Sequence, residues 1–355
     1  MKEYFWKKKE LFYFILSIMI LLCHSTGYKF YDANGIVLNE HTRTIVEILW
    51  NKINAWVGVA GFFLCSAFFL FGTYRIEDTL KKWKKRFYRL GIPYIFWNIV
   101  GVIWAIMIET LPFLKNNVTG TREHFSFGIG EVLNGVFLFK YNPPMWYILQ
   151  LLIFVIATPL LYILLKNRIV GAVVIFCSYL LYGYKISLYP FLIMQARQDV
   201  LFYYILGAYL GIHTYQFVLN QNCWKKEWSL CALIGLGIML VLCDSLKPSY
   251  SWLDMPQTLL ILILLWYGLD FFSEKIRNIN WWGIKISFFI YATHDFIEPC
   301  VNKLVWIFLP HNDAMAIFNV VAGAGVTLLI IFLMAYVLKN HFRTLWKVMN
   351  GEKVK

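Results

Sequence analysis

Charged residues are scarce in this sequence: they make up 15% of its 355 residues, while 60% are hydrophobic. A soluble fold of this length cannot cover so much apolar surface, which excludes a water-soluble globular protein. The seven cysteines contain no CxxC pair, and most lie in apolar runs, where a thiol behaves as a small hydrophobic group. We therefore expect an integral membrane protein with neither a zinc site nor a disulfide framework.

Signatures of well-known soluble enzymes are missing as well. The chain has no GxxxxGK loop for nucleotide phosphates, no GxGxxG element after a strand, no HExxH and no GxSxG. Nucleotide hydrolysis and the familiar soluble hydrolase chemistries therefore have no support. The net charge of +13 is not gathered in a soluble basic domain, so we expect no nucleic-acid partner, and we expect no metal cofactor.

What the sequence has in quantity is apolar runs. A helix needs about 17–25 apolar residues to cross about 30 Å of hydrocarbon, and ten runs approach or reach that length. They lie at 10–27, 54–72, 91–110, 144–165, 168–184, 198–214, 228–244, 252–272, 286–308 and 314–338. The sequence thus predicts an all-α, polytopic membrane helix bundle of about ten transmembrane helices.

The distribution of Lys and Arg predicts the orientation of this bundle. If both termini lie on one side, the segments on that side hold 23 of the 33 Lys and Arg residues. Loops rich in these residues stay in the cytoplasm, so we expect both termini and the loop 73–90 to be cytoplasmic. We expect one membrane domain over 1–340, a short basic cytoplasmic tail over 341–355, and contact with membrane lipids.

Two longer polar segments, 28–53 and 111–143, lie on the opposite side in this layout. The second contains Phe127–Phe139, an apolar stretch too short to cross, which predicts a re-entrant or interfacial element. Asn117 begins a triplet with N-glycosylation spacing, but such triplets are common by chance.

A run of six cations in nine residues, Lys81–Arg89, separates two of the apolar runs. Its four lysines are typical of positive-inside anchoring to acidic lipids. Arg86 and Arg89, three residues apart, project from one side if this segment is helical. Arginine binds phosphate oxygens bidentately, so the pair either holds a phosphorylated cosubstrate or serves the same anchoring.

His24 lies near the end of the first apolar run, about 20 Å along the helix from its start. An imidazole there can act as a general base toward a hydroxyl, because it takes and returns a proton near neutral pH. The alternative is a packing histidine that is hydrogen-bonded between helices, and position alone leaves both open.

His294, Asp295 and Glu298 form the densest polar group inside any predicted span. Their spacing places His294 and Glu298 on one helix face, and Pro299 is able to bend the helix behind them. A charge that faces lipid is costly, so we expect these groups to line a cavity or to pair with cations. A structural ion-pair network and a functional role both stay open.

Five motifs occur in order along the chain. They are His24 at the end of the first run, Gly61–Phe69 in the second, Arg86–Arg89 followed by Pro93–Trp97, Pro144–Leu149 opening the fourth, and Ser287–His294 in the ninth. Together, on a ten-span layout, they make the chain resemble the membrane-bound acyltransferase-3 family. Members of that family look like ten-span proteins that O-acylate cell-surface sugars.

The resemblance implies an O-acyltransferase of a bacterial cell (inner) membrane. It implies acetyl-CoA or another acyl-CoA as the cytoplasmic donor, and a hydroxyl of a cell-envelope or secreted polysaccharide, or of a lipid-linked sugar, as the acceptor. It implies that His24 is the catalytic base and that Arg86 and Arg89 bind the phosphates of CoA. The candidates for lining a path between them are Ser66, Trp146, Tyr147, Tyr291, His294, Asp295 and Glu298. Ordinary helix packing is the alternative for the three aromatic residues.

Two positions depart from the family pattern. The family usually has Arg or Lys eleven residues before the first-span histidine, where this chain has Tyr13, with Lys9 one turn earlier. Either Lys9 snorkels inward or another cation takes the place of the missing one. The second departure is Ala67, where a glycine normally follows the serine.

Two functions of other classes compete with the enzyme. A secondary transporter or flippase-like carrier also has about ten spans and ionisable groups inside the membrane, but the chain shows no internal repeat, and its basic loop is placed asymmetrically. A membrane domain that senses or anchors a partner is the third possibility. The sequence leaves open the acceptor sugar, the acyl chain and the oligomeric state.

Overall fold

The computed structural model describes residues 2–25, 31–32, 34–51, 55–112, 124–188, 191–193, 199–242 and 251–353. These residues form helices joined by turns, and no strand occurs among them. The all-α prediction is therefore confirmed. Asn117 lies outside the described residues.

Each of the ten apolar runs folds as a helix or as a helix pair. They are α1 (Lys2–His24), α4 (Ala55–Phe71), α6 (Ile92–Thr110), α9 (Trp146–Ile156) with α10 (Thr158–Leu165), α11 (Arg168–Gly183), α12 (Asp199–Asn220), α13 (Lys226–Leu242), α14 (Asp254–Gly268), α16 (Ser287–Phe308) and α17 (Asp313–His341). Shorter elements are α3 (Glu40–Asn51), α5 (Thr79–Arg86), the π-helical turn η2 (Phe87–Gly91), α8 (Ile129–Phe137), η6 (Leu269–Phe272), α15 (Ser273–Asn278) and α18 (Arg343–Asn350).

Two helical stretches among the described residues are both long and apolar enough to cross a membrane, namely Ile76–Thr110 and Asp313–His341. The pair Pro143–Ile156 and Thr158–Leu165 makes a third if it is one broken span, bent by 62°. Pro159 sits in the first turn of the second helix, where its ring prevents a straight continuation of the helix before it. The count of about ten spans and the cytoplasmic termini stay predictions.

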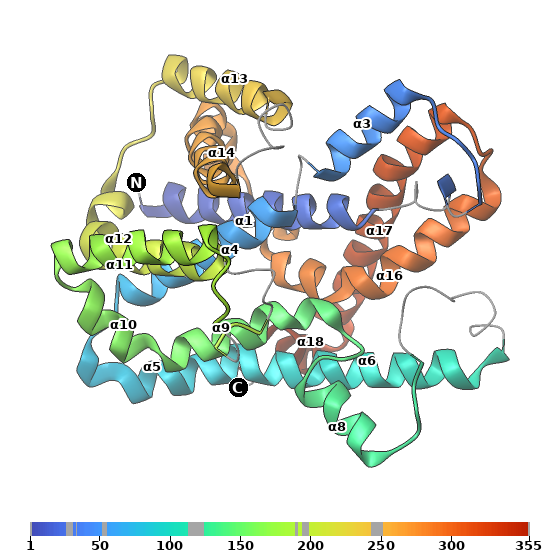
Figure 1. The fold of residues 1–355 in the computed structure, drawn as a ribbon, viewed down its shortest axis with the longest axis horizontal. Coiled ribbons are helices and arrows are strands. Elements are labelled where there is room, and N and C mark those ends of the chain that lie inside the picture. The colour runs from blue at the N-terminus through green and yellow to red at the C-terminus, as the bar shows by residue number, and fades with distance from the viewer. Residues whose placement is uncertain are drawn as a thin grey trace.

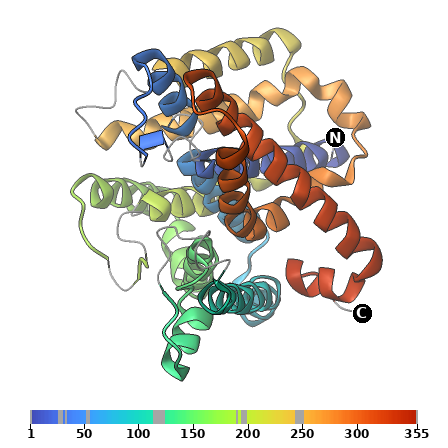
Figure 2. The same ribbon diagram turned by 90° about the vertical axis from the view of Figure 1, so that its right-hand side faces the viewer.

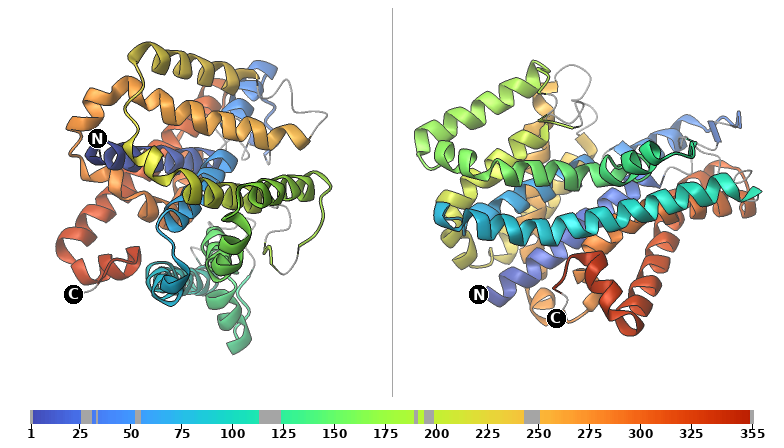
Figure 3. Two further views of the ribbon diagram at one scale, coloured as in Figure 1. Left: turned by 90° about the vertical axis from the view of Figure 1, so that its left-hand side faces the viewer. Right: turned by 90° about the horizontal axis from the view of Figure 1, so that it is seen from below.

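The helices pack around two hydrophobic clusters of buried side chains. The first is built mainly from α1, α4, α12 and α14, and the second from α6, α16, α17 and α18. Figure 1 shows α1 running through the middle of the molecule, with α13 and α14 above it and the long α5–α6 rod below. Figure 3 shows the same rod beside α9. Helix α1 therefore contacts elements from both halves of the chain.

Helices α4 and α12 approach each other closely because two glycines face α4. A side chain at Gly207 would meet the carbonyl oxygen of Leu64, and a Cβ at Gly211 would lie 2.6 Å from the carbonyl oxygen of Phe68. Small residues four apart allow such backbone contact between membrane helices. This contact holds α4, which carries Ser66, firmly against α12.

The C-terminal segment packs onto the bundle as α18 (Figure 2). The Trp346 ring lies 5.1 Å from the Phe289 ring, and the Trp97 Nε1–H donates a hydrogen bond of 3.0 Å to the Met349 carbonyl. Gly351 adopts a φ of 64° and its Cα lies against the carbonyl of Arg89. The segment predicted as a tail thus touches both α6 and the end of the basic loop.

The short apolar stretch of the second polar segment forms α8, which lies against α6. Tyr94 and Asn98 of α6 donate hydrogen bonds of 2.6 Å and 3.0 Å to the carbonyls of Phe137 and Val136. On the other side Ile129 is 83% exposed. A nine-residue helix cannot cross a bilayer, so the interfacial placement stays the prediction for α8.

Candidate functional site

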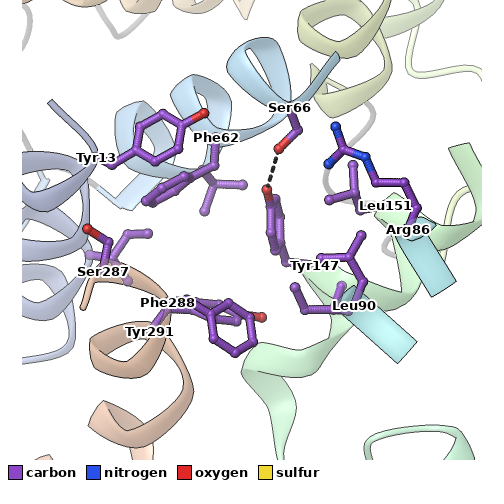
Figure 4. A pocket seen from close by; sticks show the side chains of 13 residues that line it. Tyr13, Phe62, Ser66, Arg86, Leu90, Tyr147, Leu151, Ser287, Phe288 and Tyr291 are labelled. Carbon is purple, nitrogen blue, oxygen red and sulfur yellow. Dashed lines mark hydrogen bonds between the residues drawn. The ribbon is translucent and has the colours of Figure 1, made fainter. Parts of the chain in front are cut away.

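A cavity of about 170 Å³ lies between α1, α4, α5, η2, α9 and α16. Leu90 and Tyr147, two of its lining residues, pack against both hydrophobic clusters, so the cavity sits at the seam between them. Its lining residues are Tyr13, Ile20, Val59, Phe62, Ser66, Arg86, Leu90, Tyr147, Ile148, Leu151, Ser287, Phe288 and Tyr291 (Figure 4).

Arg86 is the cation of this cavity. It is the last residue of α5 and is half-buried, and its guanidinium lies near Ser66 and Tyr147 (Figure 4). Besides burial, the groups that act on it most strongly are the side chains of Tyr204, Tyr13 and Tyr147 and the charge of Arg89. No carboxylate among the described residues is part of that set. A partly desolvated guanidinium without a carboxylate favours the arrival of an anion.

Arg89 does not join Arg86 in the cavity. It is exposed, and its backbone packs against Gly351. The helix changes from α to π geometry directly after Arg86. A π turn is wider than an α turn. Arg89 therefore does not point to the same side of the helix as Arg86, as it would in a continuous α-helix.

One wall of the cavity carries three hydroxyls. The Ser66 Oγ and Tyr147 OH atoms lie 3.4 Å apart, and the Tyr147 and Tyr291 rings meet edge to face at 5.7 Å. The Tyr291 hydroxyl donates to the Pro144 carbonyl. Ser66, Tyr147 and Tyr291 were candidates from the sequence, and all three line the cavity. Trp146 does not line it, and its ring lies 6.1 Å from Phe63 instead.

Tyr13 and Ser287 line the cavity although the sequence did not single out either as a cavity residue. Tyr13 occupies the position where the resemblance expects a cation. The Lys9 ammonium lies 5.0 Å from the Tyr13 ring and 5.1 Å from the Trp6 ring, so it is held among aromatic rings, and Arg86 is the cation that faces the cavity. Ser287 carried a signal, since it is the first residue of the Ser287–His294 motif.

His24 and His294 lie together just beyond the cavity. Their ring centroids are 4.9 Å apart, with the planes at 61°. Ile20 and Tyr291 line the cavity, and each stands about one helical turn, or about 4.5–6 Å along the axis, before the histidine of its own helix. A hydrogen bond of 3.3 Å from Ser17 Oγ to the Ser287 carbonyl joins the two helices nearby. The histidine pair therefore continues the line of the cavity along α1 and α16.

The polar residues of α16 are buried more deeply than His24. His24 is exposed at the end of α1 and Asp295 is half-buried, whereas His294 and Glu298 are each 1% exposed. His294 Nδ1 lies 2.7 Å from the Tyr291 carbonyl oxygen. His294 Nε2 and both carboxylate oxygens of Glu298 have no hydrogen-bond partner in the described structure. His294, Asp295 and Glu298 are not among the residues that line the cavity.

No group of three or more His, Cys, Asp or Glu side chains within the described ranges is arranged to hold a metal ion. The site that remains is an apolar cavity with one cation, several hydroxyls and a histidine pair at its end. Such a site suits an anionic cosubstrate whose reactive end is uncharged, with a base placed to activate a hydroxyl.

Comparison with known proteins agrees with this chemistry. A family model described as an acyltransferase domain matches residues 11–336, a range that contains every candidate site residue. No curated protein and no solved structure matches the chain. Proteins of the family are membrane-associated, in keeping with the apolar helices. The chain belongs to the membrane-bound acyltransferase-3 family and is an acyltransferase.

Proposed function

We propose that this acyltransferase is a multi-pass enzyme of the bacterial inner membrane. It moves an acyl group, most simply acetyl, from acyl-CoA in the cytoplasm to a hydroxyl of a cell-envelope or secreted polysaccharide. The observation that carries the proposal is the cavity that begins at Arg86, a guanidinium with no carboxylate partner among the described residues, and ends one helical turn from His24.

The donor end of the proposal rests on Arg86. Its fork of N–H donors matches phosphate oxygens, and its main neighbours in the described part of the chain are tyrosines rather than a counter-ion. A cavity of about 170 Å³ is smaller than pockets that enclose whole drug-sized ligands, so it suits the acyl end of the donor. The nucleotide then lies outside the cavity, where Arg89 is exposed.

The acceptor end rests on His24, which is exposed while its neighbour His294 is buried. A neutral His24 takes the proton of the acceptor hydroxyl as the oxygen attacks the thioester carbonyl. The carbon–sulfur bond then breaks, and the departing thiolate takes the proton back from His24. The products are the acyl ester and free CoA, and the base is restored.

A transfer assay tests the proposal. Purified protein is given acetyl-CoA labelled in the acetyl group together with envelope glycan, and glycan O-acetyl groups are counted in cells with and without the protein. The wild-type protein should label the glycan, and His24→Ala should lower the rate by about 10²- to 10⁴-fold.

The matched control is His341→Ala, because His341 is also an exposed histidine at the end of a helix. It should keep the wild-type rate. Equal rates for His24→Ala and wild type remove His24 from the reaction, and a wild-type protein that acylates no glycan overturns the proposed function.

A further inference from the structure

The histidine pair contains a nitrogen atom that the reaction described so far leaves without a role. His294 is 1% exposed, and its Nε2 has no hydrogen-bond partner among the described residues. A buried polar atom without a partner costs stability, and the neighbouring ring is that of His24 at 4.9 Å. A candidate partner for the His294 Nε2 atom is therefore the His24 ring.

The protonation of His294 follows from its other nitrogen. Nδ1 lies 2.7 Å from the Tyr291 carbonyl oxygen, and a carbonyl only accepts, so Nδ1 carries the hydrogen. In the neutral ring Nε2 is then a bare acceptor. The backbone bond also fixes the ring orientation, because Tyr291 stands one turn earlier on the same helix. His294 thus presents one fixed acceptor.

His24 changes its hydrogen-bonding capacity during the proposed reaction. Once it holds the proton of the acceptor hydroxyl, both of its ring nitrogens are donors. The rings now meet edge to face, and His24 is exposed at the last residue of α1. With the ring centroids 4.9 Å apart, a hydrogen bond from an N–H of His24 to the bare nitrogen of His294 requires only a reorientation of the His24 side chain.

We propose that His294 is a positioning residue for His24: its bare Nε2 accepts a hydrogen bond from His24 when His24 holds the proton. The role rests on the proposed function. The proton stays on His24 until the thiolate takes it, so His294 is never protonated. Asp295, next to His294 in sequence and acting on it electrostatically, favours positive charge on the pair.

Two amide substitutions separate this role from a structural one. His294→Asn keeps an N–H near the position of Nδ1, which preserves the bond to Tyr291, but removes the Nε2 acceptor. His294→Gln places an amide oxygen near the position of Nε2. If the acceptor matters, Asn should lower kcat by roughly tenfold or more, and Gln should recover much of that loss. If only the hydrogen bond to the Tyr291 carbonyl matters, His294→Asn should keep the higher kcat and His294→Gln should lose more.

The control variant is Thr293→Val. Thr293 is equally buried, and its hydroxyl donates a hydrogen bond of 2.7 Å to the Phe289 carbonyl in its own helix. Its kcat should match wild type. The KM for acetyl-CoA should stay within about twofold of wild type in both His294 variants, since His294 lies outside the cavity and a lost positioning contact affects only the transition state.

The outcomes distinguish the two proposals. A wild-type protein that releases no CoA from acetyl-CoA in the presence of glycan overturns the proposed function and the role of His294 with it. An active wild-type protein with His294→Asn within twofold of its kcat overturns the role of His294 alone. Thermal unfolding measurements show whether each variant is folded. If His294→Asn does not fold, the test rests on His294→Gln, and a kcat below about a tenth of wild type in that variant overturns the role of His294.

Discussion

The two ends of α1 carry buried polar clusters that differ in how their hydrogen bonds are satisfied. At the N-terminal end, the Lys8 cluster joins Lys8 Nζ to Asp270 Oδ1 at 2.7 Å, and Tyr4 and the Trp224 amide also donate to Asp270. At the C-terminal end, the His294 cluster of His294, Glu298 and Asn302 has acceptor atoms without partners in the part of the chain that the structure describes.

This difference separates a structural role from a functional one. Burying polar groups costs little when each finds its partner and much when it does not. The Lys8 cluster therefore anchors α1 to η6 and to the segment before α13. The His294 cluster lowers stability, which natural proteins accept mainly where a site needs unpaired groups. Arg86, a cation with no carboxylate partner within the described ranges, resembles the His294 cluster in this respect.

Breaking the Lys8 cluster should have the largest effect on stability. Lys8→Met leaves the buried Asp270 charge uncompensated and should lower the free energy of unfolding by about 3–5 kcal/mol, measured by denaturation in detergent. The acyl transfer rate of the protein that remains folded should not change. Adding Asp270→Asn to this variant should recover at least half of the loss, because Asn removes the charge and still accepts from Tyr4. A double variant no more stable than Lys8→Met contradicts this account.

The two arginines should differ in their effect on donor binding. Arg86→Gln removes the one cation among the described residues that line the cavity and should raise the KM for acetyl-CoA by about tenfold or more, as expected for a charge-assisted hydrogen bond. Arg89→Gln is the matched control, since Arg89 is exposed, and should change KM by less than about fivefold. Equal effects, measured by steady-state kinetics over a range of donor concentrations, show that the cavity does not distinguish the two.

The smallest effect is expected at Glu298, where the comparison is sharpest. Glu298→Gln replaces a buried carboxyl whose oxygens have no hydrogen-bond partner among the described residues, and the new amide stands one turn before Asn302, whose Oδ1 also has no partner there. Stability should stay the same or rise by up to about 1 kcal/mol. The same chemical change at Asp270, as a single variant, should destabilise the fold because it weakens the partner of Lys8. A loss at Glu298 as large as at Asp270, in parallel denaturation curves, removes the distinction between the clusters.

Hydropathy was sufficient to predict the helices but not all of their ends. Each apolar run became helical because a run of that length has few other ways to satisfy its backbone in lipid. The first run was placed at 10–27, yet α1 begins at Lys2. Polar residues extend it, with Lys7 and Glu3 forming an i, i+4 ion pair of 3.1 Å, a contact that hydropathy does not register.

The arrangement of the site was only partly predictable. Ser66, Arg86, Tyr147 and Tyr291 were found through the motifs, and they share the cavity. The contact between α1 and α16 joins residues 270 positions apart, as in the Ser17–Ser287 bond, and local patterns carry no information on such pairs. The π turn that separates Arg89 from Arg86 is likewise invisible in residue spacing. Both depend on tertiary packing.

The central claim is that one cavity serves both substrates: the donor binds at its Arg86 end, and the acceptor hydroxyl is activated at its other end by His24. Its most direct test is to measure kcat and the KM for acetyl-CoA of His24→Ala and Arg86→Gln side by side, with envelope glycan as acceptor. The account predicts that His24→Ala loses kcat by about 10²-fold or more with the donor KM unchanged, and that Arg86→Gln mainly raises the donor KM. Loss of kcat alone in both variants, or a raised donor KM in both, contradicts it.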